Sequence, residues 1–409
     1  MSEELPLKPK EVHLYKRGQL DVAPAQPKTP TMKLSAIGVL LSAGATFLLY
    51  VASAHPLNTT SDGLSVEARA VHASAPPNCF PALGFKMPSS IPSSLNNWWC
   101  DYSTEYAFVG VSYEITACQS LDTLKREFAD ELTLVSPSNN VIEAAWSAGI
   151  GVHALIWFGF DGSTIYKSRR DALFSVLKSN AKAKFVTRTV QFGSEPLYDW
   201  AIGAQDLANE VKSAKSSLSS LGIPITVSEM AYGYQVRQND GSMDVLKAID
   251  FVDAHMLPFF SQQASTEGSM STPPPDTIDA AKNSWPIVMT DLNWFLNNAG
   301  GKKIYLSQVR NCRSNFPGIT ELTTKFFQNG WPSVTSSGVQ PNSPNAVANV
   351  QNEQDYYDLL DSHCSDFKSM KGGGVGWFAH IYSDNQEPGY GIYGTNGQLK
   401  IRFSPKTSC

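Results

Sequence analysis

The chain contains little charge for its length. Only 17% of its 409 residues are charged, its formal net charge is 32 − 37 = −5, and it has no long basic run. Binding to nucleic acid normally requires clustered Lys and Arg side chains, so the composition argues against a nucleic-acid partner. The sequence also lacks His and Cys residues at the spacing of metal ligands, and we therefore expect no metal and no other cofactor.

Apolar and aromatic residues are plentiful instead. Hydrophobic residues make up 42% of the chain and aromatic residues 11%. A chain of this size and composition can bury a full core without a disulfide scaffold. With 9 Trp and 15 Tyr beside so little charge, the composition suits a neutral substrate that stacks on rings, and sugars are such substrates.

The longest apolar stretch, residues 37–54, lies near the N-terminus and follows a basic start at Lys33. It ends in Ala-Ser-Ala, so residues 32–54 are predicted to be a signal peptide that is cleaved after Ala54. The stretch is nearly long enough to span a bilayer, and a signal anchor is the alternative. Residues 1–31 form an N-terminal extension. If the apolar stretch is a signal anchor, this extension is a cytoplasmic tail. If the stretch is a cleaved signal peptide, the extension reflects a start site chosen too far upstream.

Residues 55–100 are rich in Ser, Pro and Ala, have no clear period and are predicted to be a propeptide or linker. Asn58 begins an Asn-Thr-Thr glycosylation acceptor just after the leader. An even number of cysteines, six, is compatible with disulfides outside the cell, although their pairing cannot be read from the sequence. Because Cys409 is the last residue, we expect it to form a bridge that ties down the C-terminus.

Short apolar runs alternate with segments of helical spacing from about residue 105 onward. This alternation predicts a parallel sheet, and seven repeats in one domain point to a closed (β/α)8 barrel over residues 101–409. An open doubly wound sheet is the alternative, but no Gly-x-Gly-x-x-Gly follows a strand, which removes its commonest use. The expected strands are residues 108–113, 151–160, 189–192, 225–229, 251–260, 304–308 and 375–382, and the clearest helices are residues 204–221 and 349–370.

Functional groups of such a barrel lie at the C-terminal ends of its strands. This rule selects Glu195, Glu229, Gln308, Trp157, Phe158, His255 and Trp377. Glycoside hydrolysis needs one carboxyl group to protonate the leaving oxygen and a second to attack or to activate water, and rings stack on the apolar faces of sugars. Strand-end Glu residues also form salt bridges, and Trp or His residues of a barrel are often structural, so position alone gives candidates and no mechanism.

Two segments resemble glycoside hydrolase family 17. Residues 192–196 (Phe-Gly-Ser-Glu-Pro) look like the Gly-Asn-Glu segment that carries the acid/base of that family, and residues 329–333 (Asn-Gly-Trp-Pro-Ser) match the Gly-Trp-Pro-Ser segment that follows its nucleophile. Residues 251–260 and 376–378 lie where the family has its sixth and eighth strands. The resemblance, which runs from about residue 108 to 409, implies a retaining endo-β-1,3-glucanase or transglycosylase of the fungal cell wall.

The chain departs from the family in two segments. The family has Glu directly before Gly-Trp-Pro-Ser, whereas here Gln308 ends the seventh strand and 20 residues, 309–328, separate it from Asn329. We hypothesise that this insert is an in-frame retained intron, with a loop insertion as the alternative. The family has an Arg-x-Tyr-type segment before its second strand, and residues 130–140 contain no counterpart of it. A skipped exon would account for the missing segment. The second strand is therefore predicted to be truncated.

The side chain at the nucleophile position leaves the chemistry open. The amide of Gln308 cannot act as a carboxylate nucleophile. Glu229 on the adjacent strand can supply the second carboxylate, a slower mechanism can run on Glu195 alone, or the protein can be a non-catalytic glucan-binding wall protein. Ser194 stands where the family has Asn, which calls the usual hydrogen bond to the sugar 2-hydroxyl into question.

The resulting hypothesis is a (β/α)8 barrel that acts on β-1,3-glucan, with Glu195 as general acid/base and Gln308 at the nucleophile position. The expected location is secreted or in the cell wall, with a single-pass membrane anchor and an outside-facing barrel as the alternative. The residues expected to contact glucan are Tyr113, Trp157, Phe158, Tyr232, His255, Trp331 and Trp377.

Overall fold

The computed structural model describes residues 48–52, 106–114, 142–143, 145–146, 151–158, 165–261, 280–307, 329–335 and 340–409. The chain separates into two units, Met1–Ala43 and Gly44–Cys409, and all of the described residues belong to the second.

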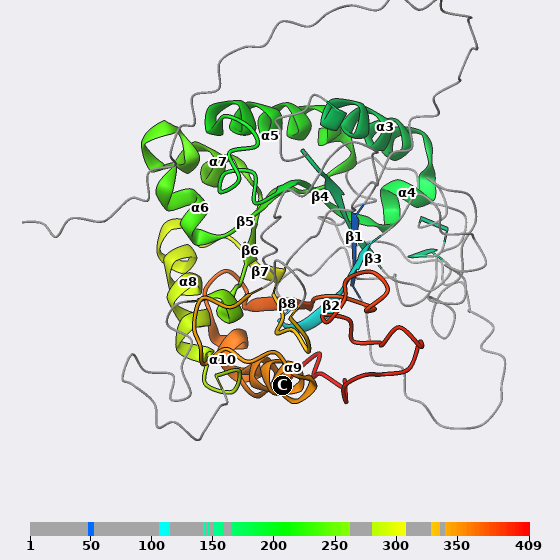
Figure 1. Ribbon diagram of the computed structural model, residues 1–409. Coiled ribbons are helices and arrows are strands. Elements are labelled where there is room, and N and C mark those ends of the chain that lie inside the picture. The colour runs from blue at the N-terminus through cyan, green and yellow to red at the C-terminus, as the bar shows by residue number, and fades with distance from the viewer. Residues whose placement is uncertain are drawn as a thin grey trace, which may run out of the picture. The chain divides into compact units, whose positions relative to one another are not determined.

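Eight strands of the described residues form one closed barrel, in the order β1-β2-β8-β7-β6-β5-β4-β3 (Figure 1). Each pair of neighbours from β3 through β8 to β2 is parallel, so seven strands run in one direction. The predicted (β/α)8 class is thereby confirmed. The strands are β1 Leu48–Ala52, β2 Ala107–Glu114, β3 Gly151–Ile156, β4 Thr187–Ser194, β5 Ile225–Glu229, β6 Val252–His255, β7 Ile304–Ser307 and β8 Val375–Ala379.

The eighth position of the barrel is filled in an unusual way. No described residue between β2 and β3 forms the parallel second strand, in agreement with its predicted truncation. In its place β1 pairs antiparallel with β2 on one side and with β3 on the other. Without it, β2 and β3 would each expose a row of unpaired backbone N–H and C=O groups. The residues of β1 come from the range predicted to be a signal peptide or signal anchor.

Helices surround the strands (Figure 1). The predicted helix at 204–221 is observed as α5 followed by a 3-10 turn, Ser219–Leu221, and its apolar residues Leu207, Val211 and Leu218 are buried. The predicted helix at 349–370 is observed as two helices that meet at His363. The helices are α3 Ile165–Ser179, α4 Ala181–Val186, α5 Ala204–Leu218, α6 Ala231–Val236, α7 Ser242–Ala248, α8 Trp285–Asn298, α9 Val350–Ser362 and α10 Cys364–Ser369. No helix of the described residues combines the length and apolar character that crossing a membrane requires.

The core has two parts. A large cluster fills the layer between the strands and the helices, and a smaller one fills the inside of the barrel. The inner cluster consists of Val109, Leu155, Phe251, Tyr305 and Phe378. The inside is therefore packed with side chains, as is usual for this fold, and the buried ring of His153 lies among them, in contact with Phe251, Tyr305 and Phe378.

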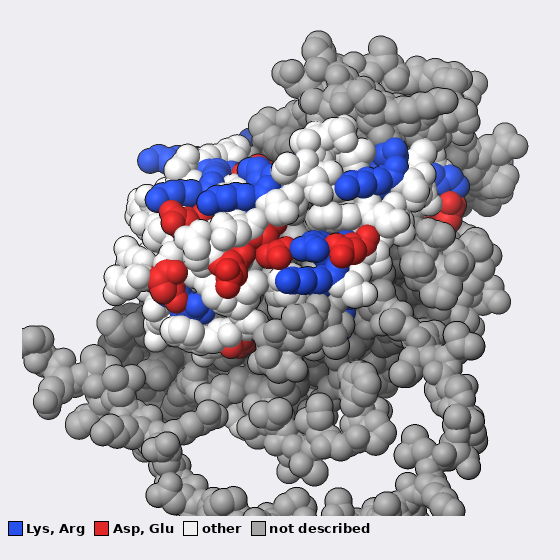
Figure 2. Space-filling model, turned by 90° about the horizontal axis from the view of Figure 1, so that it is seen from above, with Lys and Arg blue, Asp and Glu red and all other residues white. Residues whose placement is uncertain are grey.

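Charges on the outer helices neutralise one another. Arg170 of α3 donates to Glu210 of α5 at 2.6 Å, and Lys215 at the end of α5 lies 2.6 Å from Asp250. On the face of the molecule that carries α3 and α5, Lys and Arg side chains lie among Asp and Glu side chains (Figure 2). Neither sign forms a continuous patch on the described part of that face.

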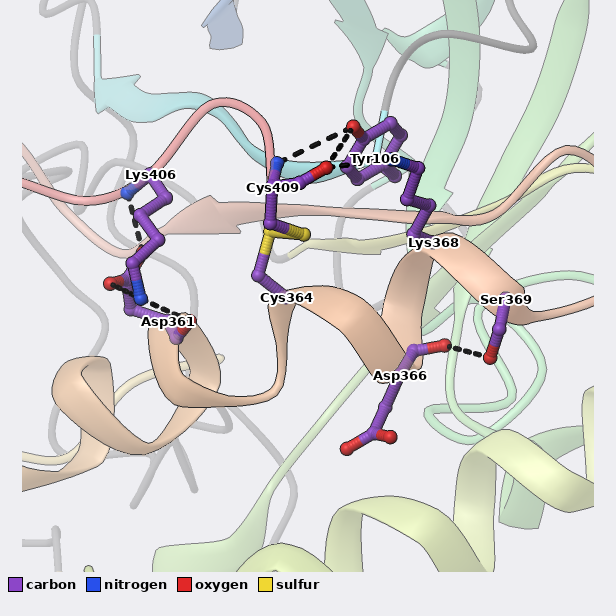
Figure 3. The surroundings of a disulfide bond; sticks show 8 residues. All are labelled: Tyr106, Asp361, Cys364, Asp366, Lys368, Ser369, Lys406 and Cys409. Atoms are coloured by element: carbon purple, nitrogen blue, oxygen red, sulfur yellow. Dashed lines mark hydrogen bonds and ion pairs between the residues drawn. A yellow bond between two sulfur atoms is a disulfide. The ribbon is translucent and has the colours of Figure 1, made fainter.

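The C-terminus is fixed beside the start of β2. Cys364, the first residue of α10, forms a disulfide with Cys409, which confirms the expected bridge at the last residue (Figure 3). The carbonyl oxygen of Cys409 accepts hydrogen bonds from Tyr106 Oη at 3.1 Å and from Lys368 Nζ at 2.6 Å. The bridge and these two contacts join the last helix, the terminus and the first parallel strand.

Removing the bridge is expected to destabilise the barrel. The two cysteines are 45 residues apart, and for a loop of that length the chain-entropy model puts the loss of unfolding free energy at about 4 kcal/mol. Urea denaturation of the double variant Cys364→Ser/Cys409→Ser measures it. Either single Ser variant is expected to lose as much as the double variant, because all three lack the same bond. Losses that add up across the two positions would contradict this account.

Candidate functional site

Glu195 follows β4 directly, where the chain turns sharply out of the sheet. Gly193 and Glu195 both have left-handed backbone conformations, with φ of 71° and 52°. A Cβ at Gly193 would lie 2.7 Å from Pro196 Cγ and 2.8 Å from Phe158 Cδ2, so only glycine fits there. The backbone N–H of Glu195 donates to Ser228 O at 2.9 Å and holds the turn against β5. A non-glycine residue in this conformation is uncommon, and such residues cluster at functional sites.

The carboxyl group of Glu195 is hydrogen-bonded inside the barrel mouth, and only 4% of the residue is exposed. Its Oε1 lies 2.7 Å from Nδ1 of His255, the last residue of β6. The other ring nitrogen of His255, Nε2, lies 2.6 Å from Oγ of Ser228 on β5. Three neighbouring strands thus hold one continuous chain of hydrogen-bonding groups.

A second carboxyl group, that of Asp253, lies beside these groups on β6. Asp253 is two residues before His255 on β6, so both side chains point to the same side of the sheet. Asp253 accepts hydrogen bonds from Gln191 of β4 and Ser307 of β7, and burial raises its pKa to about 8. All of these residues are buried. They form a polar layer above the apolar inner cluster, at the end of the barrel where catalytic groups are found in this fold.

Burial favours the neutral forms of the Glu195–His255 pair. Loss of solvent raises the pKa of Glu195 well above its usual value, and the negative charges of Glu229 and Asp199 raise it further. Loss of solvent and the nearby His380 lower the pKa of His255 to about 3. The contact between Glu195 and His255 is therefore a hydrogen bond between neutral groups, and Glu195 is held in the form that can donate a proton.

Glu229, the other predicted carboxylate, holds the loop that follows Glu195. Its Oε2 accepts from the backbone N–H groups of Leu197 at 2.7 Å and Tyr198 at 3.2 Å, and its Oε1 accepts from Met230 at 2.9 Å. Burial raises the pKa of Glu229 to about 8, and these three hydrogen bonds oppose the rise. A Cβ on Gly233 would lie 2.3 Å from Oε1. The surroundings of Glu229 fit a structural role better than attack on a sugar.

Exposed aromatic residues lie on the loop after Glu195 and on α6, the two segments on either side of Glu229. Tyr232 is 56% exposed, and its ring centroid lies 6.1 Å from that of Tyr198. Trp200 is 64% exposed, has a left-handed φ of 57° and lies under the guanidinium of Arg237 at 3.8 Å. Of the predicted sugar-contacting rings, Tyr232 and the partly buried Trp157 are therefore accessible in this structure.

Four other predicted sugar-contacting residues belong to the core, which corrects the expectation that they face the substrate. Trp377 packs between Phe108 and Tyr357, at centroid distances of 5.0 and 6.0 Å. Trp331 donates through Nε1 to Val347 O at 2.8 Å. These side chains are buried because they face the layer between strands and helices. The four residues are Tyr113, Phe158, Trp331 and Trp377.

Several residues of the site were not predicted. Ser228, Asp253, Gln191 and Ser307 form the polar layer, and Trp200 extends the exposed aromatic surface. The alternation of strand β6 could have shown that Asp253 shares a face with His255, but the partners on β4, β5 and β7 depend on the register between strands. Another buried pair, His380 Nε2 and Glu387 Oε2 at 2.8 Å, follows β8.

Two predicted positions, Gln308 and Asn58, lie outside the described residues. Within the described residues, no group of three or more His, Cys, Asp or Glu side chains could hold a metal ion.

No family model and no curated protein sequence matches the chain. Among solved structures, similar ones include an active-site mutant of the Rhizomucor miehei β-1,3-glucanosyltransferase in complex with laminaritriose, with 18% identity over 74% of this chain and 98% of that chain and a TM-score of 0.49. Another is the glycoside hydrolase family 17 β-1,3-glucanosyltransferase from Rhizomucor miehei, with 19% identity over 70% of this chain and 92% of that chain and a TM-score of 0.48.

Glu229→Gln is expected to destabilise the fold more than Glu195→Gln does. Glu229→Gln puts an NH2 group against backbone N–H donors and should lower the free energy of unfolding by about 1–3 kcal/mol. Glu195→Gln should lower it by less than about 1 kcal/mol, because its NH2 group can donate to His255 Nδ1 as the neutral carboxyl group does. Urea denaturation of both variants compares them. Equal losses would show that Glu229 has no special structural role.

Proposed function

We propose that this protein is a carbohydrate-active enzyme that hydrolyses or remodels β-1,3-glucan, with Glu195 as its general acid/base. The observation that carries the proposal is the buried carboxyl group of Glu195, hydrogen-bonded to neutral His255 at the C-terminal end of a (β/α)8 barrel. A glycosidase needs a carboxylic acid that keeps its proton near neutral pH, and burial raises the pKa of Glu195 in that direction.

The substrate class rests on two further observations. Residues 192–196 and 329–333 resemble segments of β-1,3-glucan hydrolases of family 17. Tyr232, on α6 after β5, and Trp200, on the loop after β4, expose their rings, which can stack on the apolar faces of sugars. His255 has a positioning role in this proposal, because both of its ring nitrogens are engaged by protein groups.

A glucan-binding protein without catalysis is the second candidate function. Gln308 at the nucleophile position favours it, because an amide cannot form a glycosyl ester. The hydrogen bonds around Glu229 favour it as well, since both oxygens of that carboxylate are used by the backbone. Asp199 is a further carboxyl group near Glu195; it is partly exposed, and burial raises its pKa to about 6. In an active enzyme it is our candidate to activate water.

The proposed location is outside the cell, in the cell wall. The Cys364–Cys409 disulfide supports it, because such bonds persist in oxidising compartments. Secretion through a cleaved leader at residues 32–54 is the proposed route, and a membrane anchor with an outside-facing barrel is the alternative. Either one takes β1, Leu48–Ala52, out of the barrel and leaves the site on the parallel strands β4 to β7.

Release of reducing sugar from laminarin, a β-1,3-glucan, tests the enzymatic proposal. The wild-type chain is expected to release sugar, and Glu195→Gln is expected to lower kcat about 10²–10⁴-fold, as loss of a general acid does. The assay includes Asp199→Asn and the chain without residues 309–328. Calorimetry on the same samples measures binding of laminari-oligosaccharides. If both the full chain and the chain without residues 309–328 bind the oligosaccharides but release no sugar, the protein is a glucan-binding protein and not an enzyme.

Exposed and buried aromatic residues are expected to affect binding differently. Tyr232→Ala and Trp200→Ala should each raise the Kd for laminari-oligosaccharides about 3–10-fold, as the loss of one stacking contact does. Trp377→Phe is the control, because that ring is buried against α9 and should leave Kd unchanged. Calorimetric titration measures all three. An increase in Kd with Trp377→Phe alone would show that Tyr232 and Trp200 do not belong to the binding surface.

A further inference from the structure

Arg237 follows the last residue of α6, and its buried guanidinium group has three fixed contacts. Nε donates to Asp240 Oδ2 at 2.5 Å, and Nη1 donates to Leu197 O at 3.2 Å. Its Cζ lies 3.8 Å from the ring centroid of Trp200. Because only 4% of Arg237 is exposed, its charge is compensated within the protein by a carboxylate, a carbonyl group and an aromatic ring.

These contacts hold the loop that follows Glu195. Leu197 O also accepts from the backbone N–H of Trp200 at 3.3 Å, and the N–H of Leu197 donates to Glu229 Oε2 at 2.7 Å. The loop is therefore held by a carboxyl group at the end of β5 and by a guanidinium group at the end of α6. One side chain, that of Arg237, fixes both the backbone before Trp200 and the ring of Trp200 itself.

The guanidinium group covers one face of the Trp200 ring and leaves the other open. A carbon atom so close to the centroid must lie over the ring face, because at an edge the ring's own carbons would keep it farther away. Trp200 is still 64% exposed, so the opposite face is open to solvent. A left-handed φ of 57° is costly for a residue other than glycine. Contacts that maintain such strain point to a functional role for the ring.

A second ring at this end of the barrel is supported in the same way. Trp157 directly follows β3, the neighbour of β4. The Cζ of Arg169 on α3 lies 5.1 Å from the centroid of the Trp157 ring, and Nη1 of Arg169 donates to Trp157 O at 3.0 Å. In both places an arginine lies against an indole ring and donates to a carbonyl group of the segment that carries it. The recurrence at the ends of two neighbouring strands supports a role in the site.

We propose that Arg237 is a positioning residue of the sugar-binding surface, which fixes the Trp200 ring so that its one open face meets the apolar face of a glucose unit of β-1,3-glucan. This inference rests on the proposed function for the identity of the ligand only. A side chain that is already fixed loses little conformational freedom when the sugar binds, so more of the stacking energy appears as affinity.

NMR of the full chain labelled with ¹⁵N at tryptophan tests the fixed ring without any ligand. The indole N–H resonance of Trp200 is identified by its absence from Trp200→Ala. Arg237→Met removes the guanidinium group and keeps most of the apolar side chain. The Trp200 resonance is then expected to move toward the position of a tryptophan in an unfolded chain and to become sharper. A resonance that stays in place would overturn the proposal.

Calorimetric titration with laminari-oligosaccharides shows whether Arg237 acts through Trp200. Arg237→Met is expected to raise Kd about 3–10-fold, as Trp200→Ala does, because both variants weaken the same stacking contact. The double variant is expected to bind no more weakly than Trp200→Ala alone, because without the ring Arg237 has nothing to position. Two effects on Kd that multiply in the double variant would overturn the proposal.

Lys182→Met is the matched control. Lys182 Nζ lies 5.7 Å from the ring centroid of Trp146 and 2.5 Å from Glu143 Oε2, so this variant also removes a cation from an indole ring and from a carboxylate. Its helix, α4, leads into the amino end of β4, away from the site. The Trp200 resonance and Kd should both stay unchanged. Changes as large as those of Arg237→Met would contradict a specific role for Arg237.

Asp240→Ala replaces Arg237→Met if the latter does not fold. The side chain of Asp240 is 41% exposed, and its removal takes away one of the three contacts of the guanidinium group. The Trp200 resonance should move in the same direction, and Kd should rise about 2–3-fold, as loss of a partly exposed ion pair allows. In the Trp200→Ala background Asp240→Ala should leave Kd unchanged.

The two measurements separate this inference from the proposed function. If the wild-type chain binds no laminari-oligosaccharide but its Trp200 resonance responds to Arg237→Met, the proposed function fails and the positioning role of Arg237 stands. If the wild-type chain binds the sugar and Arg237→Met changes neither the resonance nor Kd, the positioning role fails and the proposed function stands.

Discussion

The register between the parallel strands β4 to β7 is the constraint on which the site depends. The groups of the polar layer come from four different strands, and they meet only because β4, β5, β6 and β7 lie side by side in one register. A shift of one residue in any of them would turn its polar side chain toward the apolar outer layer. β3 pairs with β4 and β8 pairs with β7, so the strands that carry the site are held from both sides.

Exclusion of water then determines the protonation states of the groups that meet in the barrel mouth. In solution, a carboxyl group and an imidazole at 2.7 Å would exchange a proton and form an ion pair at neutral pH. In the barrel mouth both lose their hydration, and the neutral forms are favoured for each. The strained turn at Glu195 is followed by Leu197 and Tyr198, whose backbone N–H groups are held by hydrogen bonds to Glu229.

Much of the architecture could be predicted from sequence, and much less of the site. Strand and helix periods are local, so the parallel strands, helix α5 and the truncated second strand were recognised. Glu195 and His255 were predicted because both follow the ends of strands, and the structure brings their side chains together. The burial of Trp331 and Trp377 was not predicted, because Trp331 lies well after the end of β7 and Trp377 lies within β8, where no local pattern shows what either ring packs against. Asp253 and Ser228 were missed because their partners are set by pairing between strands, and β1 because nothing local in residues 48–52 predicts an antiparallel neighbour.

The buried carboxyl groups have a consequence for folding as a whole. Glu229 ordinarily titrates at 4.5, but burial raises its pKa to about 8, and Asp199 and Asp291 rise from 3.8 to about 6. Between these values the folded chain binds protons that the unfolded chain has released, so folding is coupled to proton uptake. The stabilisation is complete below about pH 4 and is lost as the pH rises through 6 and 8. Through these carboxyl groups acid favours the folded chain, whereas the lowered pKa of buried His255 acts in the opposite direction, because in acid the unfolded imidazole binds a proton that the folded one does not.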